Sequence, residues 1–157
     1  MIKTALIGHG YWGAKLLRYL QADRRFEVKH ICNSKTDMRQ VWPDIEAVVV
    51  ATPIETHYQI VKAALLQGKH VFSEKPLALK TKECLKLKEL AGKNNCILAV
   101  EYTQTFSRSL ETAQKINIDQ IQAIEMSVKH LGRFLKSDVY WLLGSHCLSI
   151  LNMFVPL

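Results

Sequence analysis

The sequence predicts an α/β fold: a Rossmann-type parallel sheet with helices on both faces. Strand and helix signals alternate through the first hundred residues, which is typical of parallel strands joined by crossover helices. The segment Ala47–Ala51 is an almost continuous β-branched run, as expected for a central strand buried on both faces. A glycine-rich turn joins the first expected strand to the first expected helix.

This turn has the spacing of a dinucleotide-binding loop. The expected strand Lys3–Ile7 continues into Gly8-His9-Gly10-Tyr11-Trp12-Gly13, and a helix is expected over Tyr11–Ala22. In G-x-G-x-x-G, the first glycine permits a tight turn and the second lets backbone N–H groups approach a pyrophosphate. The third lets the helix pack closely against the strand, and the helix N-terminus adds partial positive charge. The turn predicts a diphosphate site, with an ordinary glycine-rich turn as the alternative.

The remaining elements follow in order along the chain. We expect strands at Phe26–Cys32, Ala47–Ala51, Lys69–Ser73, Ile97–Val100 and Ile121–Val128, and helices at Thr56–Gln67, Thr81–Lys93, Ser107–Ile116 and Val139–Phe154. The interval from Asn33 to Ile45 has room for one helical turn, at Met38–Val41. The sheet is therefore expected to lack one strand–helix unit after its second strand. We expect a nucleotide-binding domain over residues 1–118 and a C-terminal strand and helix over 119–157.

Composition excludes several classes of protein. The 157 residues are 48% hydrophobic and 22% charged, as in globular domains, and no apolar run is long enough to span a membrane. Met1 leads almost directly into the glycine turn and the four cysteines are scattered, so we expect no signal peptide and a reduced, cytoplasmic protein. The formal net charge is +7, but many of the lysines lie on the polar face of the expected helix Thr81–Lys93. We therefore expect no nucleic-acid binding. No cluster of His, Cys, Asp or Glu has the spacing of metal ligands, so we expect no metal site either.

Two further motifs make the prediction more specific. Ala51-Thr52-Pro53 precedes Thr56-His57, and the run Gly68-Lys69-His70-Val71-Phe72-Ser73-Glu74-Lys75-Pro76-Leu77-Ala78 follows. With the glycine turn, these resemble the Gfo/Idh/MocA family of NAD(P)-dependent oxidoreductases, and Leu131-Gly132-Arg133-Phe134 and Gly144-Ser145-His146 extend the resemblance. The resemblance implies hydride transfer between NAD(P) and a hydroxyl or carbonyl carbon of a sugar, polyol or sugar derivative. It also implies a second, substrate-binding domain, most of which we expect this chain to lack.

The resemblance identifies Lys75 as the first candidate catalytic residue. It implies that Lys75 contacts the substrate hydroxyl and the nicotinamide region, where its charge would stabilise an alkoxide. Pro76 biases Lys75 toward an extended conformation, and Glu74 would orient nearby groups. The alternative is a surface lysine that precedes a turn.

His146 is the second candidate catalytic residue. The resemblance implies that it transfers protons beside the lysine, a role that suits imidazole. Leu142 and Cys147 stand where relatives carry acids, so groups that would orient the histidine are missing. A core histidine on an apolar helix remains the alternative.

The candidate cofactor residues come from four segments. Asn33 lies twenty residues after Gly13, where NAD enzymes usually place an acid on the ribose. Its amide can bond a hydroxyl, while Ser34 and Lys35 could accept a 2′-phosphate, which favours NADP without excluding NAD; a polar turn with no contact is the alternative. The resemblance implies further cofactor residues at His9, Tyr11, Trp12, Ala51, Thr52, Pro53, His57, Glu74, Lys75 and Pro76. The alternatives are a solvated residue near the helix start for His57 and simple packing in the first helical turn for Tyr11 and Trp12. Tyr102, Gln104 and Phe106 follow a strand end and are candidates for lining the active-site cleft.

Two functions remain open at this point. One is an oxidoreductase acting on a small-molecule substrate. The other is a truncated, catalytically inactive NAD(P)-binding or interaction protein. Three departures from the family pattern favour it: the short interval after Asn33, Leu142 in place of an acid, and the missing C-terminal sheet. The apolar segment Val139–Leu157 would form an exposed helix face through which a homo-oligomer could assemble.

Overall fold

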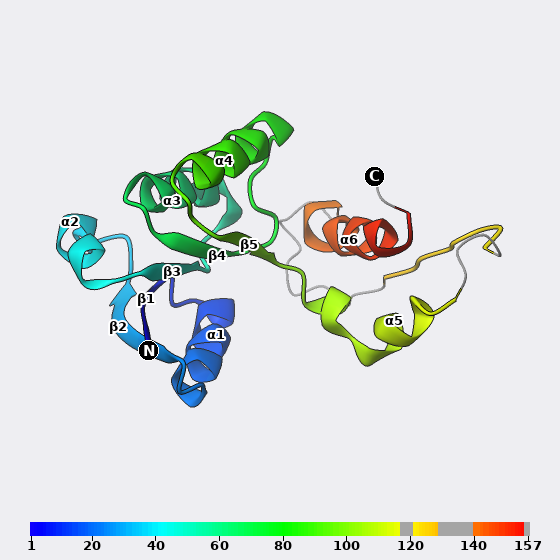
Figure 1. Cartoon of the computed structure of the whole chain (residues 1–157), viewed down its shortest axis with the longest axis horizontal. Helices are drawn as coiled ribbons and strands as arrows, with labels where there is room; N and C mark the ends of the chain where they lie inside the picture. Colours follow the sequence, from blue (N-terminus) through cyan, green and yellow to red (C-terminus); the bar gives the residue numbers. More distant parts are fainter. Residues whose placement is uncertain (117–120, 129–139, 156–157) are drawn as a thin grey trace. The chain divides into compact units, whose positions relative to one another are not determined.

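The computed structural model describes residues 1–116, 121–128 and 140–155, which divide into two compact units. The first unit is Met1–Glu101 and the second is Tyr102–Leu157, and each is described by itself (Figure 1). The expected domain boundary at 118/119, the motif at 131–134 and residue 139 lie outside the described residues.

The first unit contains a five-stranded parallel sheet, as the sequence predicts. Its order is β2-β1-β3-β4-β5. The strands are β1 (Ile2–Ile7), β2 (Phe26–Cys32), β3 (Ala47–Val50), β4 (His70–Glu74) and β5 (Leu98–Glu101). From β1 the chain moves to β2 on one side and then to β3 on the other. The strand order therefore reverses between β1 and β3, which is the switch point where open α/β sheets bind ligands.

Helices cover both faces of this sheet. Helix α1 (Tyr11–Ala22) lies on one face, and α3 (Ile54–Leu66) and α4 (Thr81–Lys93) lie on the other (Figure 1). Alternate residues of the strands supply two separate apolar clusters, because successive side chains point to opposite faces. The smaller cluster joins Leu6 and Val49 to Leu17 of α1, and the larger includes Val48, Val61, Leu65 and Leu87.

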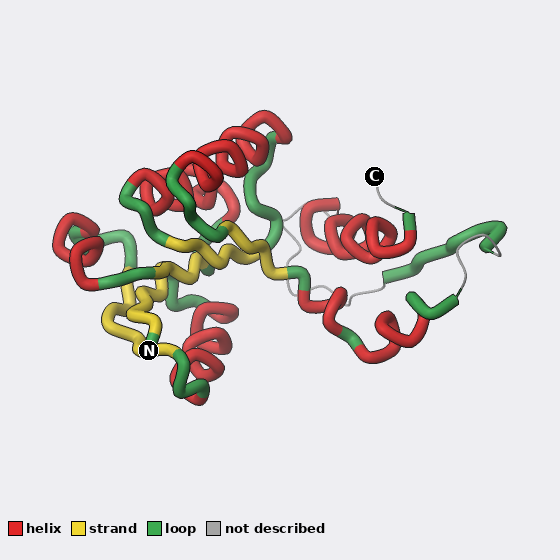
Figure 2. Tube along the Cα trace, viewed as in Figure 1, coloured by secondary structure: helices red, strands yellow, loops and turns green. Residues whose placement is uncertain are grey.

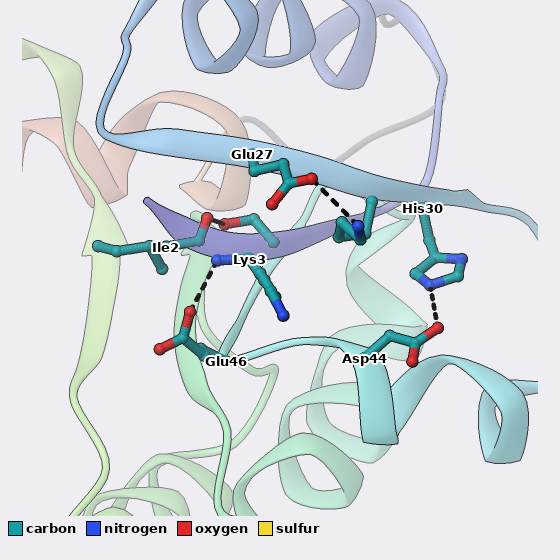
Figure 3. Close-up of polar contacts among 8 residues, drawn as sticks. Ile2, Lys3, Glu27, His30, Asp44 and Glu46 are labelled. Carbon is teal, nitrogen blue, oxygen red and sulfur yellow. Dashed lines mark hydrogen bonds and ion pairs between the residues drawn. The ribbon is translucent and has the colours of Figure 1, made fainter.

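The link between β2 and β3 is short, as expected. It contains only the four-residue α2 (Met38–Val41) and the 3-10 turn η1 (Trp42–Asp44). Two polar contacts fasten it to the sheet (Figure 3): His30 Nε2 lies 3.2 Å from Asp44 Oδ2, and the Lys3 amide donates to Glu46 Oε2 at 2.9 Å. A compact connection thus takes the place of a further strand–helix unit between β2 and β3. As a result, β2 is an edge strand of the sheet.

The second unit departs from the predicted elements. Residues 121–128 form no strand, so the prediction of a C-terminal strand there is wrong (Figure 2). An alternating pattern forms a strand only beside a partner, and no described strand pairs with this segment, whose residues 122–125 are exposed. Helix α5 spans Arg108–Ala113, and α6 spans Ser145–Phe154 after a π-helical turn at Tyr140–Gly144. Within the described residues, no helix is both long and apolar enough to cross a membrane.

Two leucines on α4 provide a test of the larger core. Leu87 is completely buried, whereas Leu85 is 60% exposed. We expect Leu87→Ala to lower the free energy of unfolding by about 2–5 kcal/mol, because it removes buried methyl groups and leaves a cavity. Leu85→Ala should change it by less than about 0.5 kcal/mol. Urea denaturation of the two variants measures both values, and equal losses would contradict the packing described.

Candidate active site at the carboxyl edge of the sheet

Strand register aligns the candidate segments along one edge of the sheet. Ile7 of β1 pairs with Val50 of β3, and Val50 pairs with Ser73 of β4. Gly8 follows Ile7, Ala51 follows Val50 and Glu74 follows Ser73. The three motifs therefore begin side by side at the carboxyl ends of their strands. The sheet therefore brings together residues that are more than sixty positions apart in the sequence, at the edge where open α/β folds bind ligands.

The glycine turn approaches the loop after β3 closely. Gly8 has a φ of +93°, and a Cβ there would lie 2.6 Å from the carbonyl oxygen of Ala51. A Cβ on Gly13 would overlap the carbonyl oxygen of Gly8, which explains why α1 can start so near the strand. Gly10 differs, since a Cβ there would meet nothing within 4 Å. The space over Gly10 is thus open to a ligand, as a diphosphate cradle requires.

The first turn of α1 presents amide groups and a positive charge beside this space. The N-cap is Gly10, and no side chain caps the helix. First-turn amides that no side chain caps favour an anionic ligand. Tyr11 and Trp12 are about half exposed, and Lys15 Nζ lies 4.3 and 4.4 Å from their ring centroids. These rings hold the Lys15 ammonium on the first turns of the helix.

The polar segment after β2 forms an exposed turn. Asn33 Oδ1 accepts a hydrogen bond of 2.9 Å from the Lys35 amide, and the Asn33 amide donates to Thr36 Oγ1 at 2.9 Å. The Asn33 side-chain oxygen is therefore engaged within the turn, which leaves its NH₂ group to donate to a ligand. Ser34 and Lys35 are exposed on the same turn.

The loop after β3 carries the second motif. Thr56 Oγ1 donates to the Pro53 carbonyl at 2.7 Å and lies 2.8 Å from Thr52 Oγ1, at the start of α3. His57 is buried, with 2% of its surface exposed. Both of its ring nitrogens contact backbone carbonyl oxygens, on Thr52 and on Pro76.

The end of β4 gathers three ionisable side chains. Glu74 is 8% exposed and stands in register with Glu101 of β5. Burial, reinforced by the charge of Glu101, raises the pKa of Glu74 to about 7. Burial also lowers the pKa of Lys75, against the opposing effect of Glu74 and Glu101. The site therefore combines a carboxyl group that titrates near neutrality with a partly desolvated amine.

Glu101 is the residue that sequence reasoning missed. Glu101 directly follows the strand expected at Ile97–Val100. A carboxylate at the carboxyl end of an expected parallel strand is the signal that could have identified it as a site residue. The sequence gives no register between β4 and β5, so it could not place Glu101 beside Glu74.

His146 belongs to the second unit. Its ring centroid lies 6.4 Å from that of Tyr102, with the rings nearly perpendicular at 84°. Gln104 and Phe106 are exposed in the 3-10 turn η2 (Thr103–Phe106). Since the two units are described separately, a joint action of His146 and Lys75 stays a prediction. Among the described residues, no group of three His, Cys, Asp or Glu could hold a metal ion.

Comparisons with known proteins agree with the fold of the first unit. The Gfo/Idh/MocA family model, described as an oxidoreductase family with an NAD-binding Rossmann fold, matches residues 36–102. The 2,7-anhydro-N-acetylneuraminate hydratase of Mediterraneibacter gnavus is 27% identical over 74% of this chain and 36% of its own length. The scyllo-inositol 2-dehydrogenase (NADP(+)) IolW of Bacillus subtilis is 27% identical over 73% and 37%, respectively.

The fold has solved counterparts as well. The crystal structure of GenD2 from gentamicin A biosynthesis, in complex with NAD, matches with a TM-score of 0.84 at 19% identity, over 98% of this chain and 53% of that one. This match shows the fold. The chain thus spans about a third of the length of the two curated relatives and about half of this solved neighbour.

The raised pKa of Glu74 predicts that stability falls as pH rises. The carboxyl keeps its proton to about pH 7 in the folded state, whereas the ordinary value is 4.5. Between pH 4.5 and pH 7 the folded state binds more protons than the unfolded state does. The free energy of unfolding should therefore fall by up to about 3 kcal/mol as the pH rises through this range. Urea denaturation from pH 4.5 to 8 measures this slope. Glu74→Gln should flatten it, and Glu55→Gln, at an exposed position on α3, should keep it. A slope unchanged by Glu74→Gln would contradict the assignment.

Proposed function

Because this chain belongs to the Gfo/Idh/MocA family and carries its NAD-binding Rossmann domain, we propose that it transfers a hydride between NAD(P) and a polyol or sugar derivative. The observation that carries the proposal is the alignment of the glycine turn, the loop after β3 and Lys75 along one edge of the sheet. Two relatives support the substrate class, since one is named for an inositol and the other for a sialic acid derivative.

The residues at the edge fit a dinucleotide. Space over Gly10 would receive the diphosphate, where the first-turn amides of α1 and Lys15 supply positive charge. Asn33 and Lys35, on the turn after β2, would contact the adenosine ribose or its 2′-phosphate. One relative is named for NADP and the solved neighbour holds NAD, so both coenzymes are candidates.

Lys75 would act on the substrate oxygen. A bound nicotinamide supplies the hydride chemistry, and the protein supplies position and field. During oxidation of an alcohol, Lys75 Nζ would accept the hydroxyl proton or stabilise the alkoxide as the carbon loses hydride. Burial lowers the pKa of Lys75, which brings the amine closer to the pH at which such a proton moves. Glu74 and Glu101 would hold the lysine and exchange protons with it.

A coenzyme titration tests the binding half of the proposal. We expect both NADH and NADPH fluorescence to change on binding, and Gly10→Ala to weaken the binding at least tenfold, because the new methyl group occupies the diphosphate space. Its effect on the free energy of unfolding should be about 1 kcal/mol or less, since the methyl group meets no protein atom. Gly92→Ala, an exposed glycine of α4 that also has open space, is the matched control and should bind as the parent does. A parent chain that binds neither coenzyme would contradict the proposal.

Turnover of inositols and other polyols tests the catalytic half. Lys75→Met keeps the length of the side chain without its charge and should lower kcat at least about 100-fold, with coenzyme affinity within threefold of the parent. Lys82→Ala, an exposed lysine of α4, should leave kcat unchanged. Coenzyme binding without turnover of any substrate would favour the alternative, an inactive NAD(P)-binding protein.

A further inference from the structure

His57 has an environment unlike that of a surface or ligand-binding histidine. It lies in the first turn of α3, four residues after Pro53, the N-cap of that helix. It is among the fully buried side chains of the first unit, with 2% of its surface exposed. A polar ring this deeply buried must be hydrogen-bonded to offset the loss of water.

Its two ring nitrogens contact two different loops. Nε2 lies 2.8 Å from the carbonyl oxygen of Thr52, in the loop after β3. Nδ1 lies 2.8 Å from the carbonyl oxygen of Pro76, in the turn after β4. The ring therefore spans the two segments that carry the Ala51-Thr52-Pro53 and Glu74-Lys75-Pro76 motifs.

These contacts restrict the chemistry of the ring. A carbonyl oxygen only accepts hydrogen bonds, so a ring nitrogen that carries a proton donates to the carbonyl that it faces. Both ring nitrogens face main-chain oxygens and the ring is buried, so neither nitrogen is left for a coenzyme group. His57 therefore acts through the segments that it holds rather than through direct contact with a ligand.

Both held segments adjoin the candidate site. Pro76 directly follows Lys75, so fixing the Pro76 carbonyl fixes the main chain from which Lys75 projects. Thr52 packs against the glycine turn, since a Cβ on Gly8 would lie 2.8 Å from Thr52 Cγ2. One buried ring thus connects the lysine segment, the loop after β3 and, through Thr52, the diphosphate turn.

We infer that His57 is a positioning residue, a buried ring that ties the loop after β3 to the turn after β4 and so holds Lys75 in place beside the coenzyme site. The part that concerns the coenzyme rests on the proposed function. The tie itself does not, because it is a property of the free chain.

Hydrogen exchange measured by mass spectrometry tests the tie without any coenzyme. In His57→Phe, peptides that cover residues 51–56 and 74–78 should exchange at least tenfold faster than in the parent, because the two carbonyls lose their shared partner. His70→Phe is the matched control. It removes an exposed hydrogen bond at the opposite end of β4, where the Ile97 amide donates to His70 Nδ1 at 3.0 Å. That variant should loosen residues 96–98 and leave the two loops protected. Unchanged exchange in both loops of His57→Phe would overturn the inference.

Two further measurements distinguish the His57 contacts from their effect on coenzyme binding, and that effect from a general loss of stability. NMR of the parent chain should show a slowly exchanging ring N–H proton on His57, because the ring is buried against two carbonyl oxygens. A ring proton that exchanges as fast as that of an exposed histidine would overturn the tie even if the variant does not fold. Coenzyme affinity should fall at least tenfold in His57→Phe and less than threefold in His70→Phe. Equal losses in the two variants would overturn the positioning role. If the parent binds no coenzyme while the exchange and NMR results hold, the tie stands and the proposed function fails.

Discussion

The site depends on how closely two backbone segments approach at Gly8. A residue with a side chain could not turn the chain there, because its Cβ would collide with the carbonyl of Ala51. The positive φ of Gly8 directs the chain into α1, and the lack of a side chain on Gly13 lets that helix pack against the turn. As a result, uncapped amides at the start of α1 lie at the carboxyl edge of the sheet, between the ends of β1 and β3. Strand register then sets the end of β4, and with it Lys75, beside the end of β3.

The ends of β4 and β5 add an electrostatic constraint. Parallel pairing in register sets Glu74 beside Glu101, and the sheet and its helices remove most of the water from Glu74. Two carboxylates so placed favour keeping a proton on one of them, and the adjacent ammonium of Lys75 offsets part of the cost. This placement of charged groups lowers the free energy of unfolding at neutral pH. Groups with shifted pKa values of this kind are common at sites where a protein carries out chemistry.

The pattern of apolar residues predicts the strands and helices of the first unit well, because each element's apolar residues face the core of that unit. The β-branched run at 47–50 is buried on both faces, and the interval after Asn33 could hold no more than α2 and η1. The same reasoning failed at 121–128. The alternating apolar residues there are typical of a strand, but a strand forms only when it pairs with another strand. Whether a partner is present depends on the tertiary structure and not on the pattern within the segment. The sequence also overestimates the length of α5, because none of its residues is buried and a short helix with little packing has nothing to extend it.

For the site, the sequence by itself determined the glycine turn, the Glu74-Lys75-Pro76 segment and their resemblance to the Gfo/Idh/MocA family. These are runs of neighbouring residues, and their spacing reflects the local backbone geometry that a nucleotide requires. The tertiary structure alone decided that Glu101 stands beside Glu74 and that His57 joins Thr52 to Pro76. Both are relations between segments that are distant in sequence, and strand register and helix packing, rather than residue spacing, set the distances between them.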